Sequence, residues 1–113
     1  MSRSQRDEIP SGTLDLLILK TLARYGQMHG FEIADSIQST SEDILQVEEG
    51  SLYPALQRML LKGWLIGEWG KTQENRRARY YTLTPEGREQ LQSELDRYGR
   101  VSLAIARILE PAS

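Results

Sequence analysis

Four basic side chains lie close together in the second half of the chain, in the stretch KTQENRRAR. They are Lys71, Arg76, Arg77 and Arg79. Ammonium and guanidinium groups bind phosphate oxygens, and arginine also reads the edge of guanine. Residues 52–81 contain six basic and two acidic side chains, a net charge of +4, so the rest of this chain of net charge −2 has −6. Such a split indicates one anion-binding surface on an acidic body, although the charges alone fit a solvated loop equally well.

An amphipathic helix is predicted immediately before this basic stretch. It opens near Gly50 or Ser51 and ends at Gly63, and its buried stripe consists of Leu52, Leu56, Met59 and Leu60. Proline is tolerated near its start, where the first helical N–H groups have no partner inside the helix. The side chains on its other sides that could contact DNA are Ser51, Tyr53, Pro54, Gln57 and Arg58. Serine and glutamine donate and accept hydrogen bonds at base edges, and a tyrosine hydroxyl reaches phosphate. An ordinary amphipathic helix fits the pattern too, and the adjoining basic stretch favours the DNA-reading interpretation.

Two aromatic-rich strands are predicted on either side of a polar loop. The strands cover residues 64–70 and 79–83, and the loop covers 71–78. If the second strand alternates regularly, Arg77 and Arg79 share one face and Arg76 lies opposite. A winged helix-turn-helix holds DNA with a helix in the major groove and a basic hairpin against an adjacent groove or the phosphates. We therefore expect a mainly α fold with a small β-hairpin, in which Lys71 and the three arginines contact DNA.

Two further helices are predicted upstream. The first has Ser11 or Thr13 as its N-cap and ends at Gly26. Its apolar residues cover more than one face, which indicates that more than the core of its own domain buries it. The second runs from about residue 29 to residue 38, with an inner face of Phe31, Ile33, Ala34 and Ile37. The lone histidine, His29, stands where a capping or packing residue is more typical than a ligand.

A long last helix is predicted to make the protein a homodimer. It begins at Thr84-Pro85, a capping residue followed by proline, and reaches about Leu109. Its apolar residues alternate steps of four and three, a heptad-like seam that so small a head cannot bury alone. The interface residues expected from the first and last helices are Leu14, Leu17, Leu91, Leu95, Tyr98, Val101, Ile105 and Ile108. The expected units are a flexible arm over 1–9, a winged-helix DNA-binding domain over 10–84, a dimerisation helix over 85–109 and a tail over 110–113.

The composition argues against several other classes of protein. The chain has no cysteine and one histidine, which excludes disulfides and conventional His/Cys zinc sites. We find no glycine-rich phosphate loop or nucleophile motif, so we expect no catalytic residue, no metal, no cofactor and no enzymatic activity. No apolar run is long enough to cross a bilayer, and the first residues lack the apolar stretch of a signal peptide. We therefore expect a cytoplasmic protein without a membrane partner.

Three aromatic side chains could line a pocket for a small planar ligand. They are Trp64, Trp69 and Tyr98. For Trp64 we favour packing in the core instead. For Trp69 and Tyr98 the two interpretations, an effector pocket and ordinary packing, stay open.

Several motifs, taken together, resemble the PadR family of bacterial transcriptional regulators. They are HGFEI at 29–33, EGSLYPAL at 49–56 and RYYTLT at 79–84, with GTLD at 12–15 as a fitting start. The resemblance covers roughly residues 10–109, and Phe31 replaces a tyrosine that is frequent in the family. It implies a winged-helix homodimer of the short type with one C-terminal helix. It also implies a repressor that binds a pseudo-palindromic operator in double-stranded DNA. Some members release DNA when they bind a phenolic or drug-like molecule.

Two other functions compete with a DNA-binding repressor. The first is a winged-helix module that binds proteins and not DNA, but such a module has no need of a net positive hairpin beside a polar helix face. The second is a small-molecule sensor or carrier, which requires a pocket near Trp69 or Tyr98.

Overall fold

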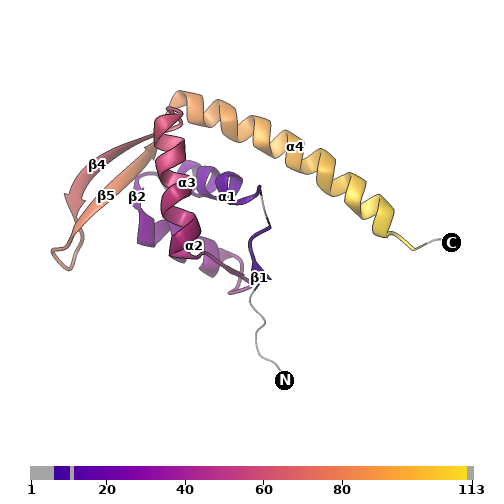
Figure 1. Ribbon diagram of the computed structural model, residues 1–113, viewed down its shortest axis with the longest axis horizontal. Coiled ribbons are helices and arrows are strands. Elements are labelled where there is room, and N and C mark those ends of the chain that lie inside the picture. Colours follow the sequence, from indigo (N-terminus) through magenta and orange to yellow (C-terminus); the bar gives the residue numbers. More distant parts are fainter. Residues whose placement is uncertain (1–6, 11, 112–113) are drawn as a thin grey trace, which may run out of the picture.

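The computed structural model describes residues 7–10 and 12–111 of the 113-residue chain. Its elements are β1 (Asp7–Glu8), α1 (Leu14–Tyr25), β2 (Met28–His29), α2 (Gly30–Thr40), β3 (Leu45–Gln46), α3 (Glu49–Leu61), β4 (Leu65–Lys71), β5 (Arg77–Leu83) and α4 (Pro85–Leu109). The first three helices and the base of the sheet form a head. The β4–β5 hairpin extends from the head to one side and α4 to the other (Figure 1). This is the mainly α winged-helix fold with a long final helix that the sequence predicts.

The sheet of the head has three antiparallel strands in the order β2-β5-β4. Its outer strand β2 pairs Met28 with Tyr81 and His29 with Tyr80. The sequence pattern does not predict β2, because a strand of two residues is too short to show a periodic pattern. The pattern also places residues 7 and 8 in a flexible arm, whereas they form β1 and pair in parallel with β3. The other arm residues before these, 1–6, lie outside the described residues.

The core of the head forms where α1 crosses α3 and the base of the sheet. Its fully buried large side chains are Ile18, Leu19, Leu22, Ile33, Leu52, Leu56, Met59 and Leu65. The predicted stripe of α3 is correct except at its edges, where Ala55 is buried and Leu60 is only partly buried. Trp64 is also partly buried against this core, as expected. The apolar spacing of each helix therefore sets which of its sides turns inward.

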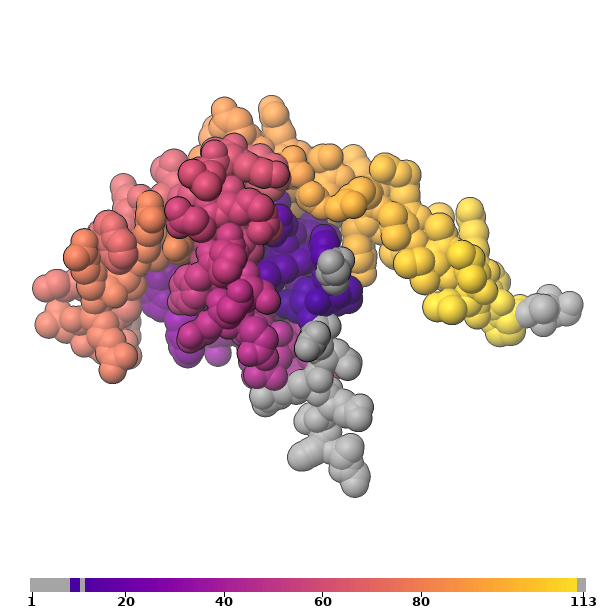
Figure 2. Space-filling view, viewed as in Figure 1, coloured from indigo at the N-terminus to yellow at the C-terminus, as the bar shows by residue number. Residues whose placement is uncertain are grey.

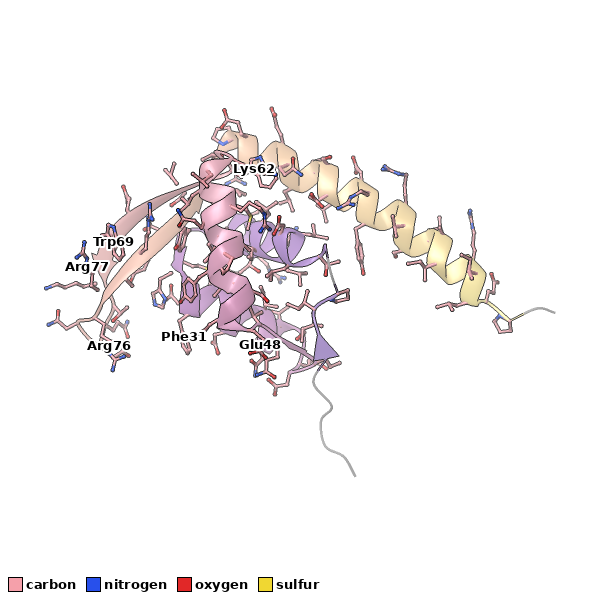
Figure 3. All side chains as sticks on the ribbon, viewed as in Figure 1. Phe31, Glu48, Lys62, Trp69, Arg76 and Arg77 are labelled. Carbon is pink, nitrogen blue, oxygen red and sulfur yellow. The ribbon has the colours of Figure 1, made fainter. Side chains whose placement is uncertain are left out.

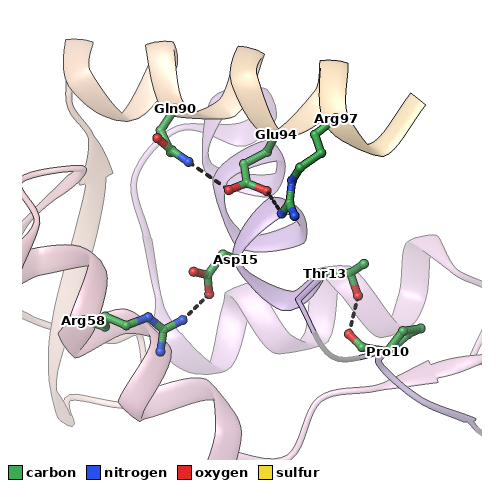
Figure 4. Close-up of polar contacts among 7 residues, drawn as sticks. All are labelled: Pro10, Thr13, Asp15, Arg58, Gln90, Glu94 and Arg97. Atoms are coloured by element: carbon green, nitrogen blue, oxygen red, sulfur yellow. Dashed lines mark hydrogen bonds and ion pairs between the residues drawn. The ribbon is translucent and has the colours of Figure 1, made fainter. Parts of the chain in front are cut away.

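Capping residues fix where α2 and α4 begin. His29, predicted to be a capping or packing residue, is the N-cap of α2. The Glu32 N–H donates to its Nδ1, and the Glu32 carboxylate accepts from its backbone N–H, which is a capping box. The Thr84 hydroxyl accepts from the Gly87 N–H at 2.9 Å and donates to the Gly63 carbonyl at 2.7 Å, which joins the start of α4 to the end of α3. At α1 the N-cap is Thr13, but its hydroxyl donates to the carbonyl of Pro10 (Figure 4). The alternative cap, residue 11, lies outside the described residues.

Most of α4 leaves the head with its apolar side chains uncovered. Only Gly87 and Leu91 of this helix are buried. The exposed large apolar side chains further along are Leu95, Tyr98, Val101, Leu103, Ile105, Ile108 and Leu109. In the space-filling view the second half of α4 projects away from the head (Figure 2). On α1, Leu14 and Leu17 are partly buried. No helix within the described ranges is both long and apolar enough to span a membrane.

Candidate nucleic-acid interface

The basic hairpin is built so that two arginines share one face with Trp69. In the β4–β5 register Trp69 is opposite Arg79 and Lys71 is opposite Arg77. Directly opposite residues of antiparallel strands point to the same side, so the predicted common face of Arg77 and Arg79 is confirmed. Both guanidinium carbons lie over the Trp69 ring, at 4.4 Å from its centroid for Arg77 and 5.8 Å for Arg79. These contacts are within the range of cation–π attraction.

The turn of the hairpin is shorter than predicted. The strands continue to Lys71 and from Arg77, so the loop covers only residues 72–76. Thr72 and Arg76 close it: the Thr72 N–H donates to the Arg76 carbonyl at 2.8 Å, and the Thr72 hydroxyl accepts from the Arg76 N–H. Arg76 therefore lies in the turn, before β5 begins, so strand alternation does not determine its side as we had expected. Its exposed side chain lies at the tip of the hairpin (Figure 3).

Two glycines of β4 make room for large side chains of β5. A Cβ on Gly67 would be 2.5 Å from Arg79 Nε, so the Arg79 side chain lies directly on the backbone of β4. A Cβ on Gly70 would be 3.1 Å from Cε1 of Tyr80 on the other face. The Arg79 Nε is buried and finds no acceptor within the described part of the chain. The Arg79 side chain therefore packs against the backbone at Gly67 and against the Trp69 ring, whereas the Arg76 side chain is exposed in the turn.

The five predicted contact residues of α3 are all exposed, as expected for its outer sides. They are Ser51, Tyr53, Pro54, Gln57 and Arg58. The helix starts at Glu49, earlier than predicted, which makes Pro54 its sixth residue. Pro54 has no N–H to donate to the carbonyl of Gly50, so this hydrogen bond is missing from the second turn of the helix.

Arg58 differs from the other four because it already has a partner. Its guanidinium forms an ion pair and hydrogen bond with the Asp15 carboxylate (Figure 4). This pair joins α3 to the first turn of α1. Nearby, Lys62 lies over the ring of Trp64, 4.9 Å from its centroid. The cations near the C-terminal end of α3, Arg58 and Lys62, therefore contact other residues of the protein, whereas Ser51, Tyr53 and Gln57 are exposed polar side chains.

Tyr53 connects α3 to α2 and to the base of the hairpin. A Cβ on Gly30 would be 2.8 Å from the Tyr53 ring, so the ring lies against the first residue of α2. Burial raises the pKa of Tyr81 at the base of β5, the Arg79 cation lowers it and the Tyr53 hydroxyl raises it. Tyr53 on α3 and Arg79 on β5 therefore both influence the buried Tyr81 hydroxyl.

Phe31 is a surface residue, contrary to its predicted place in the core. It was assigned to the inner face of α2, but it is 69% exposed. Its ring stacks on His29, with 6.5 Å between the centroids, and His29 meets Tyr80 edge-on at 5.3 Å. Figure 3 shows Phe31, Glu48 and Arg76 along one edge of the head, which includes the starts of α2 and α3 and the tip of the hairpin. The sequence spacing indicates the exposed position of Phe31. Residues i and i+2 of a helix point about 200° apart, so Phe31 and the buried Ile33 point in nearly opposite directions.

Trp69 and Tyr98 do not meet within one chain. Trp69 lies in the hairpin against Arg77 and Arg79, and Tyr98 is exposed in the middle of α4. Figure 1 shows these two elements extending from the head in opposite directions. A pocket formed by both residues would therefore need a second subunit.

Sequence and structure comparisons agree on the kind of protein. The profile of the Transcriptional regulator PadR-like family matches residues 18–93. A transcriptional regulator from Clostridium thermocellum is 25% identical, with a TM-score of 0.80 over 88% of this chain and 95% of that one. A PadR-like transcriptional regulator from Bacillus cereus is 27% identical, with a TM-score of 0.74 over 89% and 95% of the two chains. A PadR family transcription regulator from Clostridium difficile is 29% identical, with a TM-score of 0.72 over 87% and 99%. An uncharacterized protein of Lysinibacillus sphaericus is 26% identical over 105 residues, 93% of this chain and 95% of that protein.

The match includes all the elements of the candidate interface. It begins in α1, continues through α2, α3 and the β4–β5 hairpin, and ends in the first half of α4. The resemblance inferred from the HGFEI, LYPAL and YYTLT segments is thus confirmed. The chain belongs to the Transcriptional regulator PadR-like family, whose members are DNA-binding transcriptional regulators.

Proposed function

We propose that this regulator is a homodimeric repressor that binds a pseudo-palindromic site in double-stranded DNA. The outer side of α3 reads base edges in the major groove through Ser51, Tyr53 and Gln57. The wing, which is the β4–β5 hairpin with Lys71, Arg76, Arg77 and Arg79, contacts the phosphates or the adjacent minor groove. The observation that supports this most strongly is the common edge of the head formed by the start of α3 and the tip of the basic hairpin (Figure 3).

The charge distribution and the exposure of the side chains support these roles for α3 and the hairpin. The segment from residue 52 to residue 81 has a net charge of +4 within an otherwise acidic chain. Its wing cations are exposed or partly exposed, and the first half of α3 is polar. Phosphate contacts from the wing would fix the register of the protein, and the neutral donors and acceptors of α3 would discriminate bases. A module that binds only proteins remains the alternative, and nothing in that function requires this charge distribution.

The homodimer is proposed from the uncovered side of α4. Seven large apolar side chains of this helix are exposed, more than a soluble surface normally leaves without a partner. Pairing with α4 and α1 of a second subunit would cover those on the predicted seam, including Leu95, Tyr98 and Ile105. Two heads joined in this way would read two half-sites about one helical turn apart, about 34 Å. The place of action of such a regulator is the cytoplasm, which contains the bacterial chromosome.

The experiment that tests this function is a binding titration with the duplex upstream of the protein's own gene. We expect tighter binding to that duplex than to a shuffled duplex of equal length. The logarithm of the association constant should fall linearly with the logarithm of the salt concentration. In a transcription reaction from the same promoter, the protein should lower transcript yield, as a repressor does. Equal affinity for both duplexes would contradict sequence-specific binding, and no binding at low salt would favour the protein-interaction module.

An aromatic effector that binds between the α4 helices and weakens DNA binding is a further part of the proposal. Tyr98 supports it because its ring is about half exposed on α4, at the expected dimer seam. An effector that prefers one dimer geometry would change the distance between the heads. Its coupling must be reciprocal, so DNA would weaken effector binding by the same factor. Titrating planar aromatic compounds with and without operator DNA tests this, and affinity that DNA leaves unchanged would contradict it.

A further inference from the structure

Trp69 is the only large apolar side chain on the distal part of the basic face of the hairpin, within the described residues. It is 60% exposed, so the core of the head gains little from it. On its side of the hairpin, β4 contributes Gly67, Trp69 and Lys71, and β5 contributes Arg77, Arg79 and Tyr81. An exposed indole surrounded by cations needs an explanation other than packing.

The contacts of Trp69 show what the indole does to its neighbours. The guanidinium carbon of Arg77 lies 4.4 Å from the ring centroid, and that of Arg79 lies at 5.8 Å. Arg79 also lies on Gly67, where a Cβ would come within 2.5 Å of Nε. One ring therefore contacts two arginines: the exposed Arg77, and Arg79, which also rests on the backbone at Gly67.

We propose that Trp69 is a positioning residue of the DNA-binding wing, which orders the guanidinium groups of Arg77 and Arg79 before DNA arrives. The inference rests on the proposed function. A stacked guanidinium keeps its charge and its N–H donors, which lie in its own plane and are available to phosphate oxygens. Because the ring restricts both side chains in the free protein, less conformational freedom is lost when DNA binds.

Three variants separate positioning from charge. Trp69→Ala removes the ring and keeps every cation, whereas Trp69→Phe keeps a flat ring face. Ile66→Ala is the matched control, because Ile66 is also an exposed apolar residue of β4 (56%) but lies on the opposite face. Each full-length protein is titrated with the fluorescently labelled duplex upstream of its own gene at several salt concentrations.

We expect Trp69→Ala to weaken binding while the salt slope stays at the wild-type value. Loss of exposed cation–π contacts should raise the DNA dissociation constant about two- to fivefold per wing. In a dimer with two engaged wings, the dissociation constant should rise about five- to thirtyfold. Trp69→Phe should recover part of this loss, and Ile66→Ala should bind like the wild type. Wild-type affinity for Trp69→Ala would overturn the inference, as would a comparable loss for Ile66→Ala.

A double-mutant cycle distinguishes positioning from direct contact between the indole and DNA. If Trp69 acts through the arginines, replacing it in the Arg77→Ala/Arg79→Ala background should cause no further loss. If the same factor is lost in that background, Trp69 itself contacts DNA and the positioning role is wrong.

A measurement without DNA keeps this inference separable from the proposed function. In a Trp64→Phe background Trp69 is the sole fluorophore of its kind, since the chain has two tryptophans. Removing Arg77 and Arg79 should uncover the ring and increase collisional quenching by acrylamide. Unchanged quenching would show that the stack is absent in solution and would overturn the inference. Increased quenching in a protein that binds no DNA would instead contradict the proposed function and leave the stack established.

Discussion

At the scale of single residues, Gln57 and Arg58 are neighbours on α3 with different expected roles. Gln57 is exposed, while Arg58 is paired with Asp15 on α1. If Gln57 reads a base edge, Gln57→Ala should cost about 1–3 kcal/mol of binding free energy on the specific site and much less on random DNA. Arg58→Ala should instead lower the free energy of unfolding by about 1 kcal/mol, because the Arg58 side chain is 49% exposed and solvent screens its pair with Asp15. Binding titrations on both DNAs and urea denaturation measure the two effects. Equal losses for Gln57→Ala on both DNAs would mean that it contacts only phosphate.

The wing arginines are predicted to act through their charge. Each arginine that neutralises a phosphate should contribute about 0.9 to the slope of log K against log salt, and about twice that in a dimer. Replacing Arg76, Arg77 and Arg79 singly with alanine and repeating the salt titration measures these contributions. We expect reduced slopes for the arginines that contact DNA, which distinguishes them from Trp69→Ala. Unchanged slopes for all three would show that the wing does not contact phosphate.

At the scale of elements, the junction between the hairpin and α4 depends on one glycine. A Cβ on Gly87 would lie 2.2 Å from the Trp64 carbonyl oxygen and 2.7 Å from Leu83 Cδ1. Gly87→Ala should therefore push α4 away from the sheet and cost about 1–3 kcal/mol of unfolding free energy. Gly99 is the matched control in the same helix, because a Cβ there meets nothing within 4 Å. Gly99→Ala should raise stability by up to about 1 kcal/mol through helix propensity. Urea denaturation of both variants tests the prediction, and a harmless Gly87→Ala would contradict it.

Helices and long strands of this protein are predictable because each repeats its pattern over several residues. The stripe of α3 and the common face of Arg77 and Arg79 follow from periods of 3.6 and two. The strands β1 and β2 were missed because each has two residues and exists through its partner strand. Phe31 was misplaced because hydrophobicity was given more weight than its angle to Ile33.

The contacts at the interface depend on information that no local pattern contains. Trp69 meets Arg79 because of the register between β4 and β5, and register depends on the turn as well as on the strands. The pairing of Arg58 with Asp15 depends on how α3 crosses α1. The sequence therefore predicted the exposed residues of α3 and the hairpin, but not which of them contact other parts of the protein.

At the scale of the whole molecule, the extended shape of the subunit favours a dimer. The subunit extends over 58 × 39 × 22 Å because α4 projects from the head with its apolar side uncovered. The predicted seam includes Leu95 and Ile105, whereas Leu103 lies on another side of α4. Ile105 and Leu103 are about equally exposed in one subunit, at 50% and 53%, so they form a matched pair.

Charge on the seam should prevent pairing, whereas charge beside it should not. In Leu95→Asp/Ile105→Asp, two carboxylates per subunit would be buried in an apolar interface without a partner, which costs several kcal/mol per charge. We expect the mass by light scattering at micromolar concentration to fall from that of two subunits to that of one, or the protein to unfold. Leu103→Asp should keep the dimer mass and the DNA affinity. Circular dichroism separates a folded monomer from an unfolded chain. A wild-type protein with the mass of one subunit would contradict the dimer. Dissociation by Leu103→Asp alone would place the interface on a different side of α4, and the two heads would then be a different distance apart.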